Sequence, residues 1–287
     1  MTNYRKRQRR AALHGPAMEH ALNQIEVQYG HIADPGQKGK SLNKFGRTTN
    51  ADSGVRTTVA TFGSVATVNV NETYSTTNNI DYIASSSASD TEILTVEGHT
   101  IDASGNLTFT TQQVTLNGQT PVALGTLMAR ASRAFVTNGT FASPSSDLVG
   151  DIYVYVSGNT VTAGVPQTSA DVRLRIVAGK NQSEKCATSI SSTDYWILTG
   201  ITCSMAKSGG GTAACDFDIE VRELGGVWRP LGSEVDTDKQ SPFQQVIFDP
   251  YRIVKPNSDV RVVAISDSAD TEASAEIEGV LASFVDA

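Results

Sequence analysis

The chain has 287 residues, of which 39% are hydrophobic, 18% are charged and 7% are aromatic. This length can bury two hydrophobic cores, and the many small and β-branched residues favour short β-strands joined by polar turns over a helical enzyme. No apolar run approaches the ~18 residues that would span a bilayer, which disfavours a membrane protein.

The charge is segregated along the chain. The first 60 residues carry ten Lys/Arg and four Asp/Glu, a balance of +6, and the other 227 carry thirteen and twenty-six, a balance of −13, which together give −7. A basic leader on an acidic body predicts an arm that docks on a negative protein surface. A solvated tail and phosphate binding are the alternatives, and because only Tyr4 interleaves the cations, base stacking is disfavoured. The cluster comprises Arg5, Lys6, Arg7, Arg9 and Arg10.

The arm should continue as a short helix over residues 16–29, because Pro16 suits the first helical turn and Gly30 suits the position after the last. One face of this helix is apolar, with Met18, Ala21, Leu22, Ile25 and Tyr29 at helical spacing. So short a helix must pack on the body or on another subunit. Residues 31–58 are polar and predict an extended strap, so the basic N-terminal arm spans 1–58. No apolar core follows the first basic residues, so we expect no secretion signal.

From residue 59 the apolar residues recur every second position, which indicates strands. The pair Asn117-Gly118 is a strong hairpin signal because both residues tolerate positive φ. The sequence predicts one β-sandwich over 59–165, with strands at 59–62, 66–70, 92–97, 107–110, 114–116, 121–124, 133–136 and 151–156.

Pro166 to Ser169 mark a boundary, and the rest of the chain, 166–287, predicts a second β-sandwich. The clearest alternation runs from Cys215 to Arg222, with apolar residues inward and charged residues outward. Eight strands of this size favour a jelly roll, with a seven-stranded immunoglobulin-type sandwich as the rival. They fall at 171–177, 185–190, 195–205, 214–222, 226–232, 243–249, 258–266 and 273–284.

Groups that could carry catalysis are sparse. The four histidines are His14, His20, His31 and His99, so the C-terminal half lacks the commonest general base. The Gly209–Gly211 run lacks the Lys of a phosphate loop. We therefore predict no catalytic residue, cofactor or metal site. Two sets of acidic residues leave alternatives open. Asp216, Asp218 and Glu220 share one strand face, which is most simply solvated but could supply paired carboxylates for sugar hydrolysis. Asp267, Asp270 and Glu272 lie in a loop that could hold calcium.

Cysteine and tryptophan residues have mainly structural interpretations. The odd number and wide spacing of Cys186, Cys203 and Cys215 predict three buried, reduced thiols, and a Cys203–Cys215 bridge remains open. Trp196 lies in a dense apolar strand and should join a core. Trp228 lies near a strand end and is the better candidate for stacking on a sugar.

Three strings carry a family resemblance: Lys44-Phe-Gly-Arg47, Val114-Thr-Leu-Asn-Gly-Gln-Thr-Pro-Val122 and Ser132-Arg-Ala-Phe-Val136. In this order and spacing, residues 41–160 resemble a group of virion structural proteins of tailed bacteriophages. The chain departs from the family pattern at Thr48, where Asn is usual, and at Phe135, where Tyr is frequent. The resemblance implies a head-decoration or cement protein, or a neck or tail accessory.

The leading hypothesis is a non-enzymatic structural component of a tailed-phage virion, assembled in the host cytoplasm and anchored by its arm. Its partners would be other virion proteins (major capsid, portal-adaptor or tail) and further copies of the chain, with a trimer among the open symmetries, and neither nucleic acid nor membrane. The alternative is a glycan-binding module that uses the C-terminal jelly roll near Trp228 and loop 206–213, and a glycan depolymerase ranks third. The predicted docking residues are Arg5, Lys6, Arg7, Arg9, Arg10, Met18, Leu22, Ile25, Tyr29, Lys44, Phe45 and Arg47.

Overall fold

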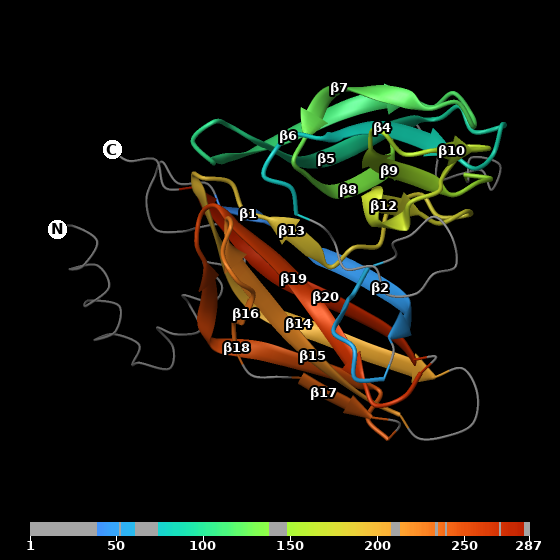
Figure 1. Ribbon diagram of the computed structural model, residues 1–287. Helices are drawn as coiled ribbons and strands as arrows, with labels where there is room; N and C mark the ends of the chain where they lie inside the picture. The colour runs from blue at the N-terminus through green and yellow to red at the C-terminus, as the bar shows by residue number, and fades with distance from the viewer. Residues whose placement is uncertain are drawn as a thin grey trace.

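The protein consists of two β-sandwiches, one stacked over an end of the other (Figure 1). The structure is a computed structural model, and it describes residues 39–51, 53–60, 74–137, 148–207, 213–232, 235–238, 240–269 and 271–283. Within these ranges the regular elements are strands and one short 3-10 segment, Ser169–Asp171. The all-β prediction is therefore confirmed. The helix predicted over residues 16–29 lies outside the described residues.

The first sandwich packs a four-stranded sheet on a three-stranded sheet, and its core lies between them. The larger sheet has the order β12-β9-β4-β7 and the smaller has the order β6-β5-β8. Alternating residues of these strands point into this core, as with Leu94 and Val96 of β5, and β9 is buried on both faces, because Tyr153 and Tyr155 join a second apolar cluster. The strands are β4 (Ile80–Ser85), β5 (Ile93–Ile101), β6 (Leu107–Thr115), β7 (Val122–Met128), β8 (Arg130–Val136), β9 (Ile152–Val156) and β12 (Val172–Ile176), with a small ribbon of β10 (Val161–Thr162) and β11 (Val165–Pro166).

A turn at Asn117-Gly118 is present between β6 and β7, but these strands belong to different sheets and do not pair, so the predicted hairpin is wrong. Gly118 has a φ of 55°, and Thr120 N–H donates to the Asn117 carbonyl at 3.0 Å. A Cβ on Gly118 would also lie 2.6 Å from the Ala88 carbonyl oxygen. Both observations require glycine here, because other residues rarely adopt this conformation and none could fit.

The second sandwich has a jelly-roll-like strand order. Its first sheet runs β2-β20-β14-β18, with β1 also on β20, and its second runs β13-β19-β15-β17, with β3 and β16 at its margins. Successive strands mostly alternate between the two sheets, as expected of a jelly roll. The strands are β1 (Gly39–Ser41), β2 (Lys44–Ala51), β3 (Thr57–Thr58), β13 (Ala187–Ser189), β14 (Asp194–Lys207), β15 (Ala214–Glu223), β16 (Arg229–Pro230), β17 (Val235–Asp238), β18 (Phe243–Val254), β19 (Ser258–Ser266) and β20 (Thr271–Ser283).

The core of the second sandwich follows the predicted alternation. Cys215, Phe217 and Ile219 of β15 point inward, and Trp196 of β14 is fully buried among them. The prediction that Trp196 packs in a core is confirmed. All three cysteines are free and buried, which confirms the thiol prediction and excludes the Cys203–Cys215 bridge in this structure. Burial raises the pKa of Cys186 and of Cys215 to about 12, so neither is a reactive thiolate at neutral pH.

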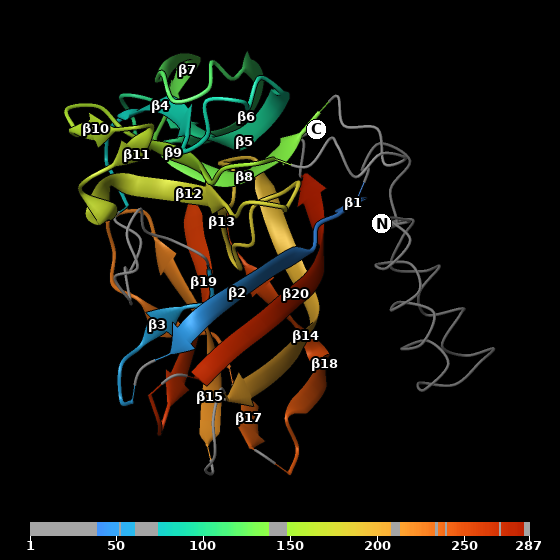
Figure 2. The same cartoon turned by 90° about the vertical axis from the view of Figure 1, so that its right-hand side faces the viewer.

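Three segments lie elsewhere than the sequence suggested. The second half of the expected strap forms β2, which pairs with β20 (Figure 2). Val59 joins the core of the second sandwich, because its N–H donates to the Val262 carbonyl at 2.9 Å. The strand expected at 171–177 is β12, which follows the 166–169 segment yet pairs with β9 in the first sandwich. The first sandwich is therefore inserted between β3 and β13 of the second.

Gly46 allows β2 to approach its neighbours closely. A Cβ at this position would lie 2.1 Å from the Val59 carbonyl oxygen and 2.2 Å from the Cys186 amide nitrogen. Both neighbours are backbone atoms, which cannot move aside independently. No side chain other than hydrogen fits this site.

We expect Gly46→Ala to lower the free energy of unfolding by about 3 kcal/mol, because the methyl group forces the backbones apart. Gly125→Ala is the matched control, since its Cβ would have only an ordinary contact at 3.6 Å, and should change stability by less than ~0.5 kcal/mol. Urea denaturation of both variants measures the difference. Equal stabilities would contradict the close approach.

Candidate docking site

The predicted docking residues divide into two groups. Lys44, Phe45 and Arg47 are described and lie on β2. The other nine, together with the predicted helix, lie outside the described residues and remain predictions: Arg5, Lys6, Arg7, Arg9, Arg10, Met18, Leu22, Ile25 and Tyr29. The arm meets the described structure at Gly39, where β1 pairs with β20.

Lys44 is turned into the protein and is not available to a partner. Its ammonium is buried and donates to the Ser132 carbonyl of β8 at 2.6 Å. Burial, followed by the nearby Lys185, lowers the pKa of Lys44 to about 8. The docking role predicted for Lys44 is therefore wrong in this fold, because alternation along β2 places its side chain between the two sandwiches.

Phe45 and Arg47 occupy the opposite face of β2. Phe45 is 42% exposed and stands beside Glu276 in the strand register. Arg47 forms an ion pair with Glu272 of β20, and the two side chains are 40% and 35% exposed. Of the described docking residues, only these two lie on an accessible sheet face.

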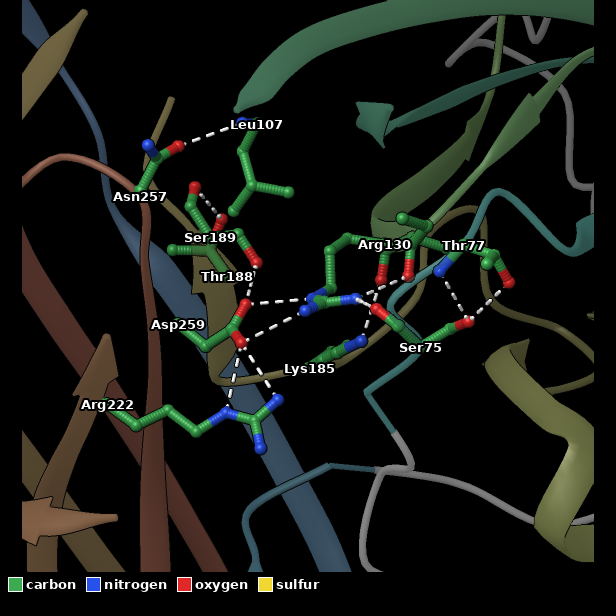
Figure 3. Close-up of polar contacts among 12 residues, drawn as sticks. Ser75, Thr77, Leu107, Arg130, Lys185, Thr188, Ser189, Arg222, Asn257 and Asp259 are labelled. Carbon is green, nitrogen blue, oxygen red and sulfur yellow. Dashed lines mark hydrogen bonds and ion pairs between the residues drawn. The ribbon is translucent and has the colours of Figure 1, made fainter. Parts of the chain in front are cut away.

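The junction between the sandwiches is organised by the carboxylate of Asp259 on β19 (Figure 3). Arg130 of β8 donates to it from Nε at 2.8 Å and from Nη2 at 3.2 Å. Arg222 donates from Nε and Nη2, each at 3.0 Å, and Ser189 donates its hydroxyl at 2.6 Å. Asp259 has no exposed surface and Arg130 is 2% exposed. Burial alone would raise the pKa of Asp259, but the hydrogen bonds and charge of Arg130, with those of Ser189 and Arg222, lower it below its ordinary value.

Further buried polar contacts fasten the same junction. The Lys185 ammonium donates to the Ala131 carbonyl at 2.7 Å, one residue along β8 from the carbonyl that accepts from Lys44. The Asn257 side chain accepts from the Leu107 amide at 2.8 Å. Four separate polar side chains therefore cross the junction, and each finds a partner on the other sandwich. A buried contact of this kind fixes the relative orientation of two domains.

Beside this junction lies a groove of about 350 Å³. Its walls come from both sandwiches and from β1, where the arm begins. The Lys40 ammonium lies 6.0 Å from the centre of the Phe109 ring, and His99 packs edge-on against the same ring at 5.6 Å. Burial lowers the pKa of His99 to about 4, so the imidazole is neutral at physiological pH. The side chains that give the groove its character are Lys40, Glu97, His99, Phe109, Arg133 and Asp194.

Trp228 is half-buried, and its ring already contacts two arginines and a tyrosine. Arg261 lies 4.2 Å and Arg222 lies 4.9 Å from its ring centre, and Tyr74 packs edge-on at 5.2 Å. A nearby cavity of about 360 Å³ is lined by Val227 and Arg229 but not by Trp228. The ring therefore serves as a cation–π partner for the arginines of this region.

The acidic row on β15 is covered, contrary to the solvated interpretation. Arg56 donates to Asp218 and, at 2.7 Å, to Glu220, which also accepts from Arg261 at 2.8 Å. Asp218 and Glu220 are 8% and 4% exposed. Burial and the neighbouring Asp236 raise the pKa of Asp216. Asp218 and Glu220 therefore neutralise arginines, whereas the neighbour of Asp216 is another carboxyl group, that of Asp236.

Two other sequence hypotheses concern metals and membranes. Within the described residues no group of three or more His, Cys, Asp or Glu side chains could hold a metal ion. Two residues of the proposed calcium loop have other partners in the structure: Glu272 pairs with Arg47, and Asp267 accepts a hydrogen bond from the Ala214 amide at 2.9 Å. The third, Asp270, lies outside the described residues. The described part of the chain contains no helix with the length and apolarity to cross a membrane.

Comparisons with known proteins place no family name on the chain. No protein-family model matches it, and no curated protein matches it. Among solved structures, the alignment with a chain of the infectious bursal disease virus particle covers 99% of this chain and 82% of the viral chain. The sequence identity is 8% and the TM-score is 0.19. The VP2 subviral particle of the same virus covers 86% and 72% at 10% identity, with a TM-score of 0.20. The CBM22-1–CBM22-2 tandem domain of Paenibacillus barcinonensis Xyn10C covers 90% and 96% at 12% identity, with a TM-score of 0.21. Likeness at this level carries no argument about function.

We expect Asp259→Ala to lower the free energy of unfolding by about 4 kcal/mol, because it leaves the buried guanidinium group of Arg130 and the partly buried one of Arg222 without their counter-ion. Glu272→Ala breaks the partly exposed pair with Arg47 and should cost less than ~1 kcal/mol. Chemical denaturation followed by tryptophan fluorescence measures both. A loss at Asp259 no larger than that at Glu272 would show that the junction does not depend on the carboxylate.

The pH dependence of stability should report His99. Its folded pKa of about 4 lies below its ordinary value of 6.5, so the unfolded chain binds more protons between these values. The contribution of His99 to the free energy of unfolding is therefore fully present above pH ~6.5. It falls by about 3 kcal/mol as the pH is lowered to ~4. Subtracting the profile of His99→Gln from that of the wild type isolates this contribution. Parallel profiles would be inconsistent with a buried neutral imidazole.

Proposed function

We propose that this chain is a non-enzymatic structural protein of a virus particle, attached to its neighbours through residues 1–38. By the resemblance of residues 41–160, the particle is that of a tailed phage and the chain is a head-decoration or cement protein, or a neck or tail accessory. Its partners are other virion proteins and further copies of itself, assembled in the host cytoplasm.

The observation that carries this proposal is the buried junction centred on Asp259. Four cationic side chains form ion pairs or hydrogen bonds within it: Arg130, Arg222, Lys44 and Lys185. These contacts hold the two sandwiches together as one rigid body. Such a body suits a particle component that must keep its shape under load. The chemically versatile groups in the described residues, the cysteines and His99, are buried and serve packing.

The attachment segment follows from charge. The basic cluster at residues 5–10 precedes β1 in the sequence, whereas the remainder of the chain from residue 61 carries a balance of −13. The two charges favour contact between the leader of one molecule and an acidic surface of another. Since β2 and β3 are built into the second sandwich, the attachment segment ends near residue 38, not residue 58.

Glycan binding is the second function considered from the sequence, and no specific observation favours it. Arg222 and Arg261 already pack against the ring of Trp228, and the loop at 208–212 lies outside the described residues. The groove beside Phe109 is a more open aromatic site, but its position at the entry of the arm favours a protein contact.

We expect a chain lacking residues 1–38 to remain folded and soluble but to be excluded from particles. Deletion leaves β1 and the other described strands intact and removes six Lys and Arg residues, five of them in the cluster at residues 5–10. Incorporation is measured by quantifying the chain in particles assembled with the full or the truncated protein. A full-length variant with Gln at the five basic positions of residues 5–10 separates charge from length. Normal incorporation of both variants would overturn the proposal.

A further inference from the structure

One edge of the second sandwich is unusually suited to pairing with another strand. β18 ends the sheet β2-β20-β14-β18, and within the described residues its only strand partner is β14. It is 12 residues long, and Phe243, Ile247 and Ile253 on it are 59%, 68% and 59% exposed. Natural edge strands are usually short or protected by charges. Its first six residues, Phe-Gln-Gln-Val-Ile-Phe, carry no charge and have high β-propensity.

The register shows which backbone groups face the open edge. Met205 N–H donates to the Pro242 carbonyl at 2.9 Å, which makes these residues a hydrogen-bonded pair. Such pairs recur at every second residue of an antiparallel ladder. Gln244 and Val246, opposite Cys203 and Ile201, therefore direct their backbone groups to β14. Phe243, Gln245 and Ile247 direct theirs to the open edge.

The same three residues expose their side chains on one face of the sheet. Phe243, Gln245 and Ile247 are all exposed, whereas Phe248 turns into the core. We propose that this edge pairs antiparallel with the same edge of a second copy of the chain, about a two-fold axis at Gln245. Phe243 then faces Ile247 of the second copy, an aromatic and β-branched pair, and Gln245 faces its own equivalent. Three hydrogen-bonding residues of each copy become paired.

The lack of charge along the Phe243–Phe248 part of this edge favours a second copy of the chain as its partner. A two-fold pairing places identical residues opposite one another, so it requires a segment free of like charges. The Phe243–Phe248 segment meets this requirement in a chain whose body is otherwise strongly acidic. The regular stretch ends where the ladder shifts register between Leu198 and Gly200, close to Asp249 and Pro250. The pairing therefore spans Phe243–Ile247 and joins two five-stranded sheets into one.

This inference concerns self-association of the isolated chain and does not depend on incorporation into particles. We expect the full-length wild type to self-associate in sedimentation velocity. Gln245→Lys should weaken that association at least about tenfold, because two ammonium groups would face each other across the axis. Gln245→Glu should do the same with two carboxylates. A mixture of the two variants should associate at least as well as the wild type, because opposite charges then meet.

The controls separate this model from its rivals. Val149→Lys alters an equally exposed apolar residue of the first sandwich, 67% exposed, and should leave association unchanged. Circular dichroism verifies that every variant is folded. A monomeric wild type, or undiminished association of Gln245→Lys, would overturn the proposal. Weakened association of both charged variants without recovery in the mixture would also overturn it. That result would indicate that the β18 edge pairs with another segment, such as residues 1–38.

Discussion

The structure depends on one buried carboxylate, that of Asp259. It lies where the first sandwich meets the second, and it accepts hydrogen bonds from guanidinium groups of both. A charge in this position is tolerated only with partners in good geometry. The arrangement therefore specifies the orientation of the two sandwiches, since any tilt that separated Arg130 from Asp259 would leave buried ions unpaired. The lysines beside it, whose ammonium groups bond to successive carbonyls of β8, impose the same requirement.

Local patterns in the sequence predicted the features that depend on neighbouring residues, namely strand positions, a tight turn and the core-facing side of a strand. Alternation located most strands of both sandwiches, Asn117-Gly118 located a turn but not the predicted hairpin, and the alternation of β15 identified which of its faces joins the core. The pattern could not show which sheet a strand joins, so β2 was interpreted as a strap and β12 was assigned to the wrong sandwich. Sheet membership is set by pairing with strands elsewhere in the chain, such as that of Lys44 with Ile277 or of Val172 with Tyr155, and this pairing leaves no mark on local periodicity.

The candidate site was harder to predict than the fold, for the same reason. In the string Lys44-Phe-Gly-Arg47, the two cations are three residues apart and therefore lie on opposite faces of β2, and the sequence does not show which of these faces meets the other sandwich. Lys44 is buried and bonded, whereas Arg47 reaches Glu272 at the surface. The strongest sequence signal for the junction was Asp259 itself, a charged residue within an apolar strand, and it was not singled out.

The insertion of the first sandwich between β3 and β13 has a mechanical consequence. A domain appended to a chain terminus hangs from one peptide connection and can swivel about it. Here the inserted sandwich returns to its carrier, so two backbone connections act in parallel, one before Ile80 and one after Ile176. Torque applied to its outer loops is shared between them, and unravelling it cannot begin from a free end.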